Sequence, residues 1–177
     1  DQALELLPSD YWRWYLMANA PESSDAAFTL EQFQQTINAD LANVFGNFVN
    51  RITRFCASKY GQVVPAGGGP RRPDSDLWTS VWARYLDMTE AMEQMEFRKA
   101  AAALRQLWVA GNEYLQVAAP WTAIKSEPDR EYAAHATRTA LSYCVLISQL
   151  SLPFIPDAAG SVLNAFGRPP GFARWPN

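Results

Sequence analysis

The fold is decided by residues 33–55, which read FQQTINADLANVFGNFVNRITRF. At roughly 100° per residue, the apolar side chains of this stretch fall within about a third of a helix circumference; they are Phe33, Ile37, Leu41, Val44, Phe45, Phe48, Ile52 and Phe55. An adjoining arc carries polar side chains, namely Asp40, Asn43, Asn47, Asn50, Arg51 and Arg54. The pattern predicts a long helix that turns one face to a core and a polar arc outward.

The polar arc is unusual in its asparagines, because Asn is a poor residue for a helix interior. Asn47 and Arg51 are four residues apart and therefore neighbours on the helix surface. An amide offers a donor and an acceptor side by side, and a guanidinium offers a planar fork of donors that can also stack. Such a pair can read the edge of an unstacked, single-stranded base. The simpler interpretation is a solvated helix face.

Composition limits the possible functions. The 177 residues are 49% hydrophobic, enough for one domain or one domain with a linker. The net charge of -3 provides no general attraction for nucleic acid, so any RNA contact must be local. Cys56 and Cys144 lie far apart and form no CxxC pair, so we expect reduced core cysteines in a cytoplasmic chain, without a metal site.

No secretory signal and no run of 18 apolar residues is present, so no membrane segment is expected. The sequence begins at Asp1, without Met and already in helix-like sequence. We therefore expect a piece of a longer protein.

Helical periodicity runs through nearly the whole chain, and no clear alternation typical of strands is found. This predicts an all-α, antiparallel bundle of about five main helices. Helices are expected at residues 10–19, at 29–59 after a capping box at Thr29, from 75 or 76 onward, at 96–118, and from a cap at Asp129 onward, with a short last helix at 157–166. Residues 60–73 hold four Gly and three Pro and are expected to form a long loop.

Two helices have apolar faces that predict the rest of the core. The helix that begins near residue 75 carries Trp78, Val81, Trp82, Tyr85, Met88 and Met92 on one side. The next carries Leu104, Leu107, Trp108, Gly111 and Leu115. A stripe of Met and Trp at helical spacing is typical of a core rather than of a cofactor site.

Motifs for catalysis are missing from the sequence. The single histidine, His135, has no nucleophile or second metal ligand at a local spacing. Gly67, Gly68 and Gly69 are followed by proline rather than by a helix start, so they cannot direct a helix dipole at a phosphate. We therefore expect no catalytic residue, no cofactor and no metal in this chain.

Trp121 is a second candidate for function. It follows Ala119 and Pro120, where the residue before proline ends the preceding helix. A tryptophan just past a helix end can serve as a stacking platform for a base, although such residues also serve as hydrophobic lids. Antiparallel helices can bring this helix end beside Asn47, which would unite the two signals.

Three separated motifs resemble one known family. Residues 10–16 read D-Y-W-R-W-Y-L, and residues 38–51 match N-A-D-L-x-N-x-x-G-N-x-x-x-R at every named position. Asn112-x-Tyr114 and Pro120-Trp121, with Lys125 beyond, complete the set. In this order they resemble the C-terminal anticodon-binding domain of the methionyl-tRNA synthetase family, which are class I aminoacyl-tRNA synthetases.

The resemblance implies a helical bundle that reads the CAU anticodon loop of methionine tRNAs. By position, Asn47 and Arg51 correspond to the residues that bond base edges, and Trp121 to the stacking residue. Arg54, Arg71 and Arg72 are weaker candidates for contact with the RNA backbone. The family's longer enzyme is a cytoplasmic ligase that uses ATP and Mg²⁺.

The resemblance also implies a division of labour with the rest of such an enzyme. This chain lacks the HIGH-type and KMSKS-type signatures and the zinc-binding cysteines, so it is expected to be inactive alone and to depend on a catalytic domain as its partner. Residues 1–27 would be a linker helix from that domain, residues 28–166 the bundle, and residues 167–177 an irregular tail.

Two alternatives remain at this stage. The bundle can be a non-catalytic helical module that binds protein partners, or the corresponding domain of a sister class I synthetase. The Pro120-Trp121 pair, together with the G-N-x-x-x-R spacing, argues against the sister synthetase.

Overall fold

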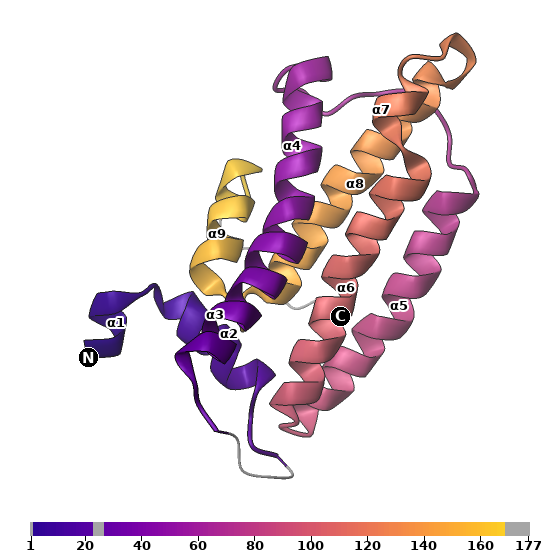
Figure 1. Cartoon of the computed structure of the whole chain (residues 1–177). Coiled ribbons are helices and arrows are strands. Elements are labelled where there is room, and N and C mark those ends of the chain that lie inside the picture. The colour runs from indigo at the N-terminus through magenta and orange to yellow at the C-terminus, as the bar shows by residue number, and fades with distance from the viewer. Residues whose placement is uncertain (1, 23–26, 169–177) are drawn as a thin grey trace.

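The predicted all-α bundle is confirmed. The computed structural model describes residues 2–22 and 27–168, and within these ranges every regular element is helical (Figure 1). Seven α-helices there have eight residues or more, rather than about five: α2 (Ser9–Ala18), α3 (Leu30–Ile37), α4 (Asn47–Tyr60), α5 (Arg72–Glu93), α6 (Phe97–Ala118), α8 (Arg130–Ser151) and α9 (Pro156–Ala165). Shorter elements are α1 (Gln2–Leu6), α7 (Pro120–Ala123) and the 3₁₀ turn η2 (Glu127–Asp129).

The core surrounds α6, which packs against α5, α8 and α4 (Figure 1). The predicted inward face of α6 is confirmed, since Leu104, Leu107, Trp108 and Leu115 are all inaccessible to solvent. Trp14 of α2 extends this core, and its ring centroid lies 4.5 Å from that of Trp108.

The long helix predicted at residues 29–59 is continuous, but its number of residues per turn changes partway along. A π-helical segment, η1 (Asn38–Gly46), joins α3 to α4. A π-helix holds more residues per turn than an α-helix, so side chains in η1 rotate away from the faces expected at 100° per residue. At its start, as predicted, the Thr29 hydroxyl accepts the N–H of Gln32 at 3.1 Å.

This rotation corrects the prediction for Asp40. We expected Asp40 on the outward polar arc, but it is 8% exposed. Its carboxylate accepts the indole N–H of Trp14 at 3.1 Å and pairs with Nε of Arg105 at 2.5 Å. The other polar side chains of the arc stay outward: Asn43, Asn47, Asn50 and Arg54 are exposed, and Arg51 is half-buried.

The predicted core stripe of α5 is wrong for its two tryptophans. Trp78 and Trp82 are 41% and 63% exposed, whereas Val81 and Met88 are buried as expected. The reason is that α5 lies at the edge of the bundle and packs mainly on α6, so its inward face is narrower than the apolar stripe. The two indoles instead line a shallow groove with Leu146 and Leu150 of α8.

The loop between α4 and α5 is irregular, as predicted, and it is held against α8. Arg138 donates to the carbonyl oxygens of Pro65 and Gly67 at 2.9 and 3.1 Å. Gly68 has φ +67°, and a Cβ there would lie 2.1 Å from the Glu131 carbonyl oxygen. Only glycine therefore fits this approach.

Asp129 is the N-cap residue of α8, as predicted, but its side chain makes no capping hydrogen bond. Its carboxylate pairs instead with Arg71, at the other end of the long loop, at 2.8 Å.

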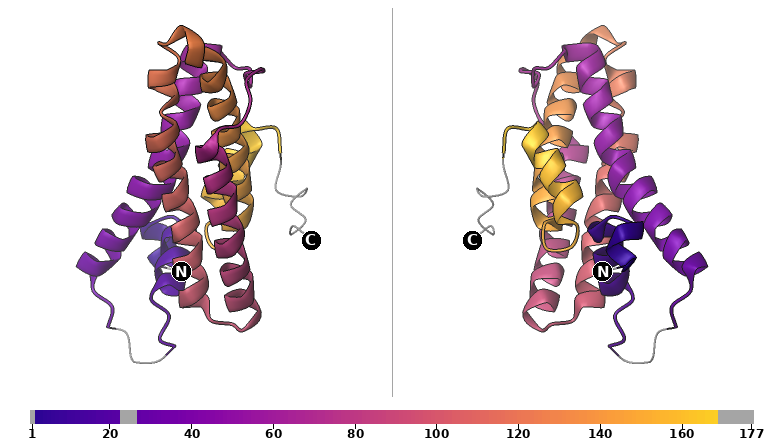
Figure 2. Two further views of the ribbon diagram at one scale, coloured as in Figure 1. Left: turned by 90° about the vertical axis from the view of Figure 1, so that its right-hand side faces the viewer. Right: turned by 90° about the vertical axis from the view of Figure 1, so that its left-hand side faces the viewer.

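Both ends of the described chain pack on one flank of the bundle (Figure 2). Asp10 of α2 is 3% exposed and accepts the backbone N–H groups of Asp157 and Ala158, at 3.2 and 2.7 Å, at the start of α9. A carboxylate at a helix N-terminus satisfies donors that the helix itself cannot. Of the tail predicted at 167–177, residues 169–177 lie outside the described part.

Candidate functional site

The structure brings Arg51 and Trp121 into contact, with Asn47 one turn away on the helix of Arg51. The guanidinium carbon of Arg51 lies 4.8 Å from the centroid of the Trp121 ring, and Asn47 lies one turn before Arg51 on α4. Phe55 meets the same indole edge-on, at 6.4 Å between centroids. Figure 1 shows α7 and the C-terminal half of α4 at the same end of the bundle.

Trp121 owes its place to the turn that precedes it. Ala119 has φ 38° and ψ 57°, a left-handed conformation that L residues rarely adopt. Pro120 then starts the short helix α7. Trp121 is half-buried against the core, so it acts partly as the lid considered above while the remainder of its surface stays accessible.

Asn47 is held by a residue of α6. Its amide nitrogen donates to Oδ1 of Asn112 at 2.9 Å. The amide nitrogen of Asn112 donates in turn to the carbonyl oxygens of Val44 and Trp108, at 3.0 and 3.3 Å. From the sequence, Asn112 stands out only as part of the family motif, although an amide next to a buried helix face indicates a residue that needs hydrogen-bond partners.

A close approach of α6 to α4 makes this amide pair possible. A Cβ at Gly111 would lie 3.0 Å from two ring carbons of Phe48 and from Cε1 of Tyr143. Gly111 therefore lets the two helices approach until Asn112 reaches Asn47.

The three arginines predicted to contact RNA backbone differ in setting. Arg54 is exposed on α4, one turn beyond Arg51. Arg71 pairs with Asp129, which lowers the pKa of that carboxyl, and its guanidinium lies 4.1 Å from the ring centroid of Tyr132. Arg72 is highly exposed, with Nε 3.5 Å from Asp76. For all three, contact with RNA stays a prediction.

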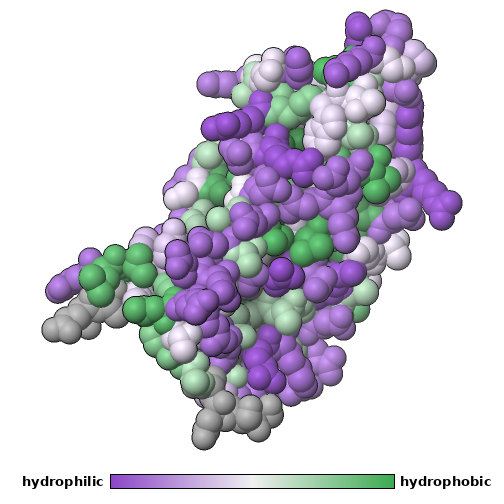
Figure 3. Space-filling view, viewed as in Figure 1, coloured by the Kyte–Doolittle hydropathy of each residue, from purple (hydrophilic) through white to green (hydrophobic). Residues whose placement is uncertain are grey.

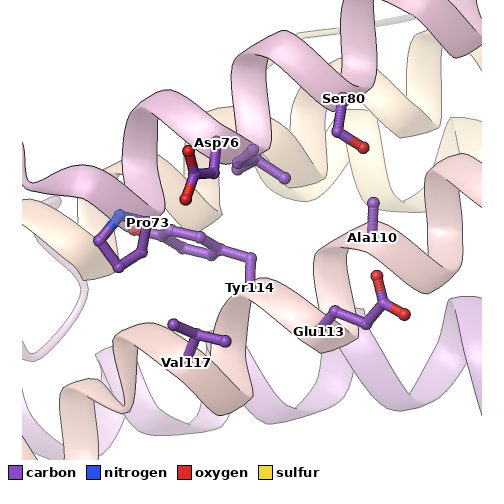
Figure 4. Close-up of a pocket in the computed structure, with 8 residues that line it drawn as sticks. Pro73, Asp76, Ser80, Ala110, Glu113, Tyr114 and Val117 are labelled. Carbon is purple, nitrogen blue, oxygen red and sulfur yellow. The ribbon is translucent and has the colours of Figure 1, made fainter.

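A second polar region lies between α5, α6 and α8. A pocket of about 170 Å³ lies between α5 and α6, lined among others by Asp76, Glu113 and Tyr114 (Figure 4). The Tyr114 hydroxyl donates to buried Asp74 at 2.8 Å. The pKa of Tyr114 is raised, mainly by burial and secondly by this hydrogen bond to the carboxylate. His135 is mostly buried, with Nε2 3.5 Å from the same carboxylate. These contacts tie three helices together and present no activated nucleophile.

The described residues offer neither a metal site nor a membrane span. No group of three or more His, Cys, Asp or Glu side chains there is arranged to hold a metal ion. No helix in the same ranges is both long enough and apolar enough to cross a bilayer.

Solved structures share this fold. Free methionyl-tRNA synthetase of Mycobacterium tuberculosis superimposes with a TM-score of 0.89 and 24% sequence identity, over 98% of this chain and 36% of that one. The same enzyme bound to methionyl-adenylate gives a TM-score of 0.85 over 98% of this chain and 35% of that one. The chain therefore shares its all-α fold with about a third of that enzyme.

Sequence comparison then defines the family. A family model described as the anticodon binding domain of methionyl tRNA ligase matches residues 64–177, and one described as tRNA synthetases class I (M) matches residues 1–53. The chain belongs to the family of anticodon-binding domains of methionyl-tRNA ligase.

Two similar proteins are methionine–tRNA ligases. The methionine–tRNA ligase of Caulobacter sp. (strain K31) is 55% identical over 99% of this chain and 30% of its own length. That of Caulobacter vibrioides (strain NA1000 / CB15N) is 58% identical over 94% of this chain and 29% of its own length. The chain thus spans about 30% of the length of these relatives.

Proposed function

We propose that this chain reads the CAU anticodon loop of methionine tRNAs, initiator and elongator alike. The observation that carries the proposal is the packing of Arg51 of α4, one turn beyond Asn47, over the ring of Trp121 of α7, from helices far apart in sequence. An aromatic face beside an amide and a guanidinium supplies what a splayed base requires: a stacking surface and edge-directed hydrogen bonds.

Each residue has a part in this recognition. An extruded base stacks on the accessible part of the Trp121 ring, and the Arg51 guanidinium leaves the indole to donate to the base edge. Asn47 is exposed and meets a base edge beside it. With a net charge of -3, phosphate attraction is weak, so selectivity comes from shape and edges. Exposed Arg54 is the nearest candidate for a phosphate, with Arg71 and Arg72 further along the chain.

The chain is proposed to act within a longer enzyme. Its relatives are methionine–tRNA ligases more than three times its length, and the M. tuberculosis neighbour has been solved with methionyl-adenylate. We place ATP, Mg²⁺ and methionine on a catalytic domain outside this sequence, with residues 1–27 as the connection to it and residues 28–166 as the reading bundle. The setting proposed is the cytoplasm.

The test is binding of anticodon hairpins that differ only in the CAU triplet, followed by fluorescence anisotropy. Trp121→Ala is expected to weaken binding of the CAU hairpin by about 5- to 150-fold, the loss of one stacked base. Trp82→Ala removes an exposed indole on α5 and serves as the matched control, with affinity unchanged. The proposal fails if the chain binds all triplets equally, or if Trp121→Ala has no more effect than Trp82→Ala.

A further inference from the structure

The amide of Asn112 can adopt only one orientation. Its nitrogen faces two carbonyl oxygens, those of Val44 and Trp108. An amide oxygen in that place would confront two acceptors with no proton between them, whereas the nitrogen has a proton for each. The Oδ1 atom of Asn112 is therefore turned toward Asn47.

This orientation decides what Asn47 can offer. Because Asn112 presents an acceptor, only the amide nitrogen of Asn47 can face it, and the 2.9 Å bond confirms that arrangement. The Oδ1 atom of Asn47 is thereby directed away from Asn112, on a side chain that is exposed. We infer that Asn112 is a positioning residue that fixes Asn47 with its acceptor outward, so that the site selects a base with an amine, rather than a keto oxygen, at pyrimidine C4 or purine C6. This inference rests on the proposed function.

The surroundings of Asn112 make the constraint firm. Asn112 is half-buried, and Trp108, one turn earlier on α6, is inaccessible to solvent. If the Asn112 amide were flipped, its oxygen would face two carbonyl oxygens, and little water can reach them to donate the missing hydrogen bonds. Unpaired acceptors of this kind are costly in a partly buried network. Val44 belongs to the π-helical segment η1, which runs directly into α4. The backbone of the helix that carries Asn47 therefore fixes the orientation of the Asn112 amide.

Cytosine and adenine carry amines where uracil and guanine carry keto oxygens. The outward Oδ1 atom of Asn47 can accept a hydrogen bond from the amine of cytosine or adenine. The same atom would face the keto oxygen of uracil or guanine, which has no proton to donate. Without Asn112, the Asn47 amide can turn and offer either its oxygen or its nitrogen. Loss of Asn112 should therefore relax selectivity by improving the binding of the keto base.

The test compares the CAU hairpin with UAU and CGU hairpins. UAU replaces the 4-amine of cytosine by a keto oxygen, and CGU replaces the 6-amine of adenine by a keto oxygen and adds a 2-amine. The chain is expected to prefer CAU over at least one of them by about 5- to 150-fold. Asn112→Ala should reduce that preference to about twofold or less. Gln116→Ala removes an exposed amide one turn further along α6 and serves as the control, with the preference unchanged.

Asn112→Asp separates orientation from stability. One carboxylate oxygen still accepts from Asn47 and keeps its acceptor outward, while the other opposes the carbonyls of Val44 and Trp108. This variant should unfold at lower urea concentration and yet retain the preference for CAU. If preference instead follows stability across the two variants, or if Asn112→Ala keeps the wild-type preference, the inference is wrong while the proposed function stands. A wild-type chain that binds no hairpin selectively would overturn both.

Discussion

Gly111→Ala tests how closely the two helices that build the site must approach. The added Cβ would lie 3.0 Å from two ring carbons of Phe48 and from one of Tyr143. Both rings are fully buried, and the Tyr143 hydroxyl donates to the Leu107 carbonyl at 2.6 Å. Neither ring has room to retreat, so we expect α4 and α6 to move apart.

Two opposing terms set the size of the effect. Forcing a methyl group into a packed core costs about 1–3 kcal/mol. Replacing glycine by alanine in a helix interior stabilises by about 0.8–1 kcal/mol. The net expectation is destabilisation by about 1 kcal/mol, within a range of about 0 to 2. Ala102→Gly, at an exposed position of the same helix, measures the propensity term alone and allows the steric term to be isolated.

The assay is urea unfolding followed by circular dichroism, together with binding of the CAU hairpin. Because Phe48 directly follows Asn47, a displaced ring should lengthen the bond between Asn47 and Asn112 and weaken the preference for CAU. If Gly111→Ala stabilises the chain by as much as Ala102→Gly destabilises it, no steric term exists. The close approach would then not limit the site.

Three further outcomes are expected. Ala119→Gly should stabilise the chain by about 0.5–1 kcal/mol in urea unfolding, because glycine adopts φ 38° without a Cβ clash; a loss of stability would contradict this. Asp40→Ala should cost about 1–3 kcal/mol, since it leaves the buried Trp14 N–H without an acceptor; Asp40→Asn keeps an acceptor and should cost clearly less, whereas equal costs would point to the partner Arg105 instead. Burial raises the pKa of Cys144 to about 12, from 9.0 in an ordinary thiol. The stability that the neutral thiol contributes is therefore complete below pH 9 and lost as the pH rises toward 12. Between pH 8 and 10 the free energy of unfolding should fall less steeply for Cys144→Ala than for wild type, and identical slopes would refute the assignment.

Periodicity predicts much of the fold and the placement of part of the candidate site. The inward faces of α4 and α6 follow from a 3.6-residue repeat, because both helices are packed on the side that carries their large apolar residues. The same repeat placed Asn47 and Arg51 beside each other on the outer side. Their meeting with Trp121 was a hypothesis about tertiary structure that only coordinates could test.

The errors have physical causes. Asp40 was expected outward because the calculation assumed an uninterrupted α-helix, whereas η1 is π-helical and turns that residue toward Trp14. Nothing in a count of apolar spacings reveals a local change in the number of residues per turn. Trp78 and Trp82 were expected inward because a stripe identifies an apolar face but not whether a neighbouring helix is wide enough to cover it.

The site depends on α6 for both of its non-local parts. Asn112 lies in the last two turns of that helix, and Ala119 at its end directs the chain into α7 and Trp121. Any shift of α6 relative to α4 therefore moves both Asn112, the residue proposed to orient the Asn47 amide, and Trp121, the residue proposed to stack the base, in the same direction. Edge selectivity and stacking are consequently coupled through one helix, so a substitution such as Gly111→Ala should alter both, whereas Trp121→Ala should alter stacking without freeing the Asn47 amide.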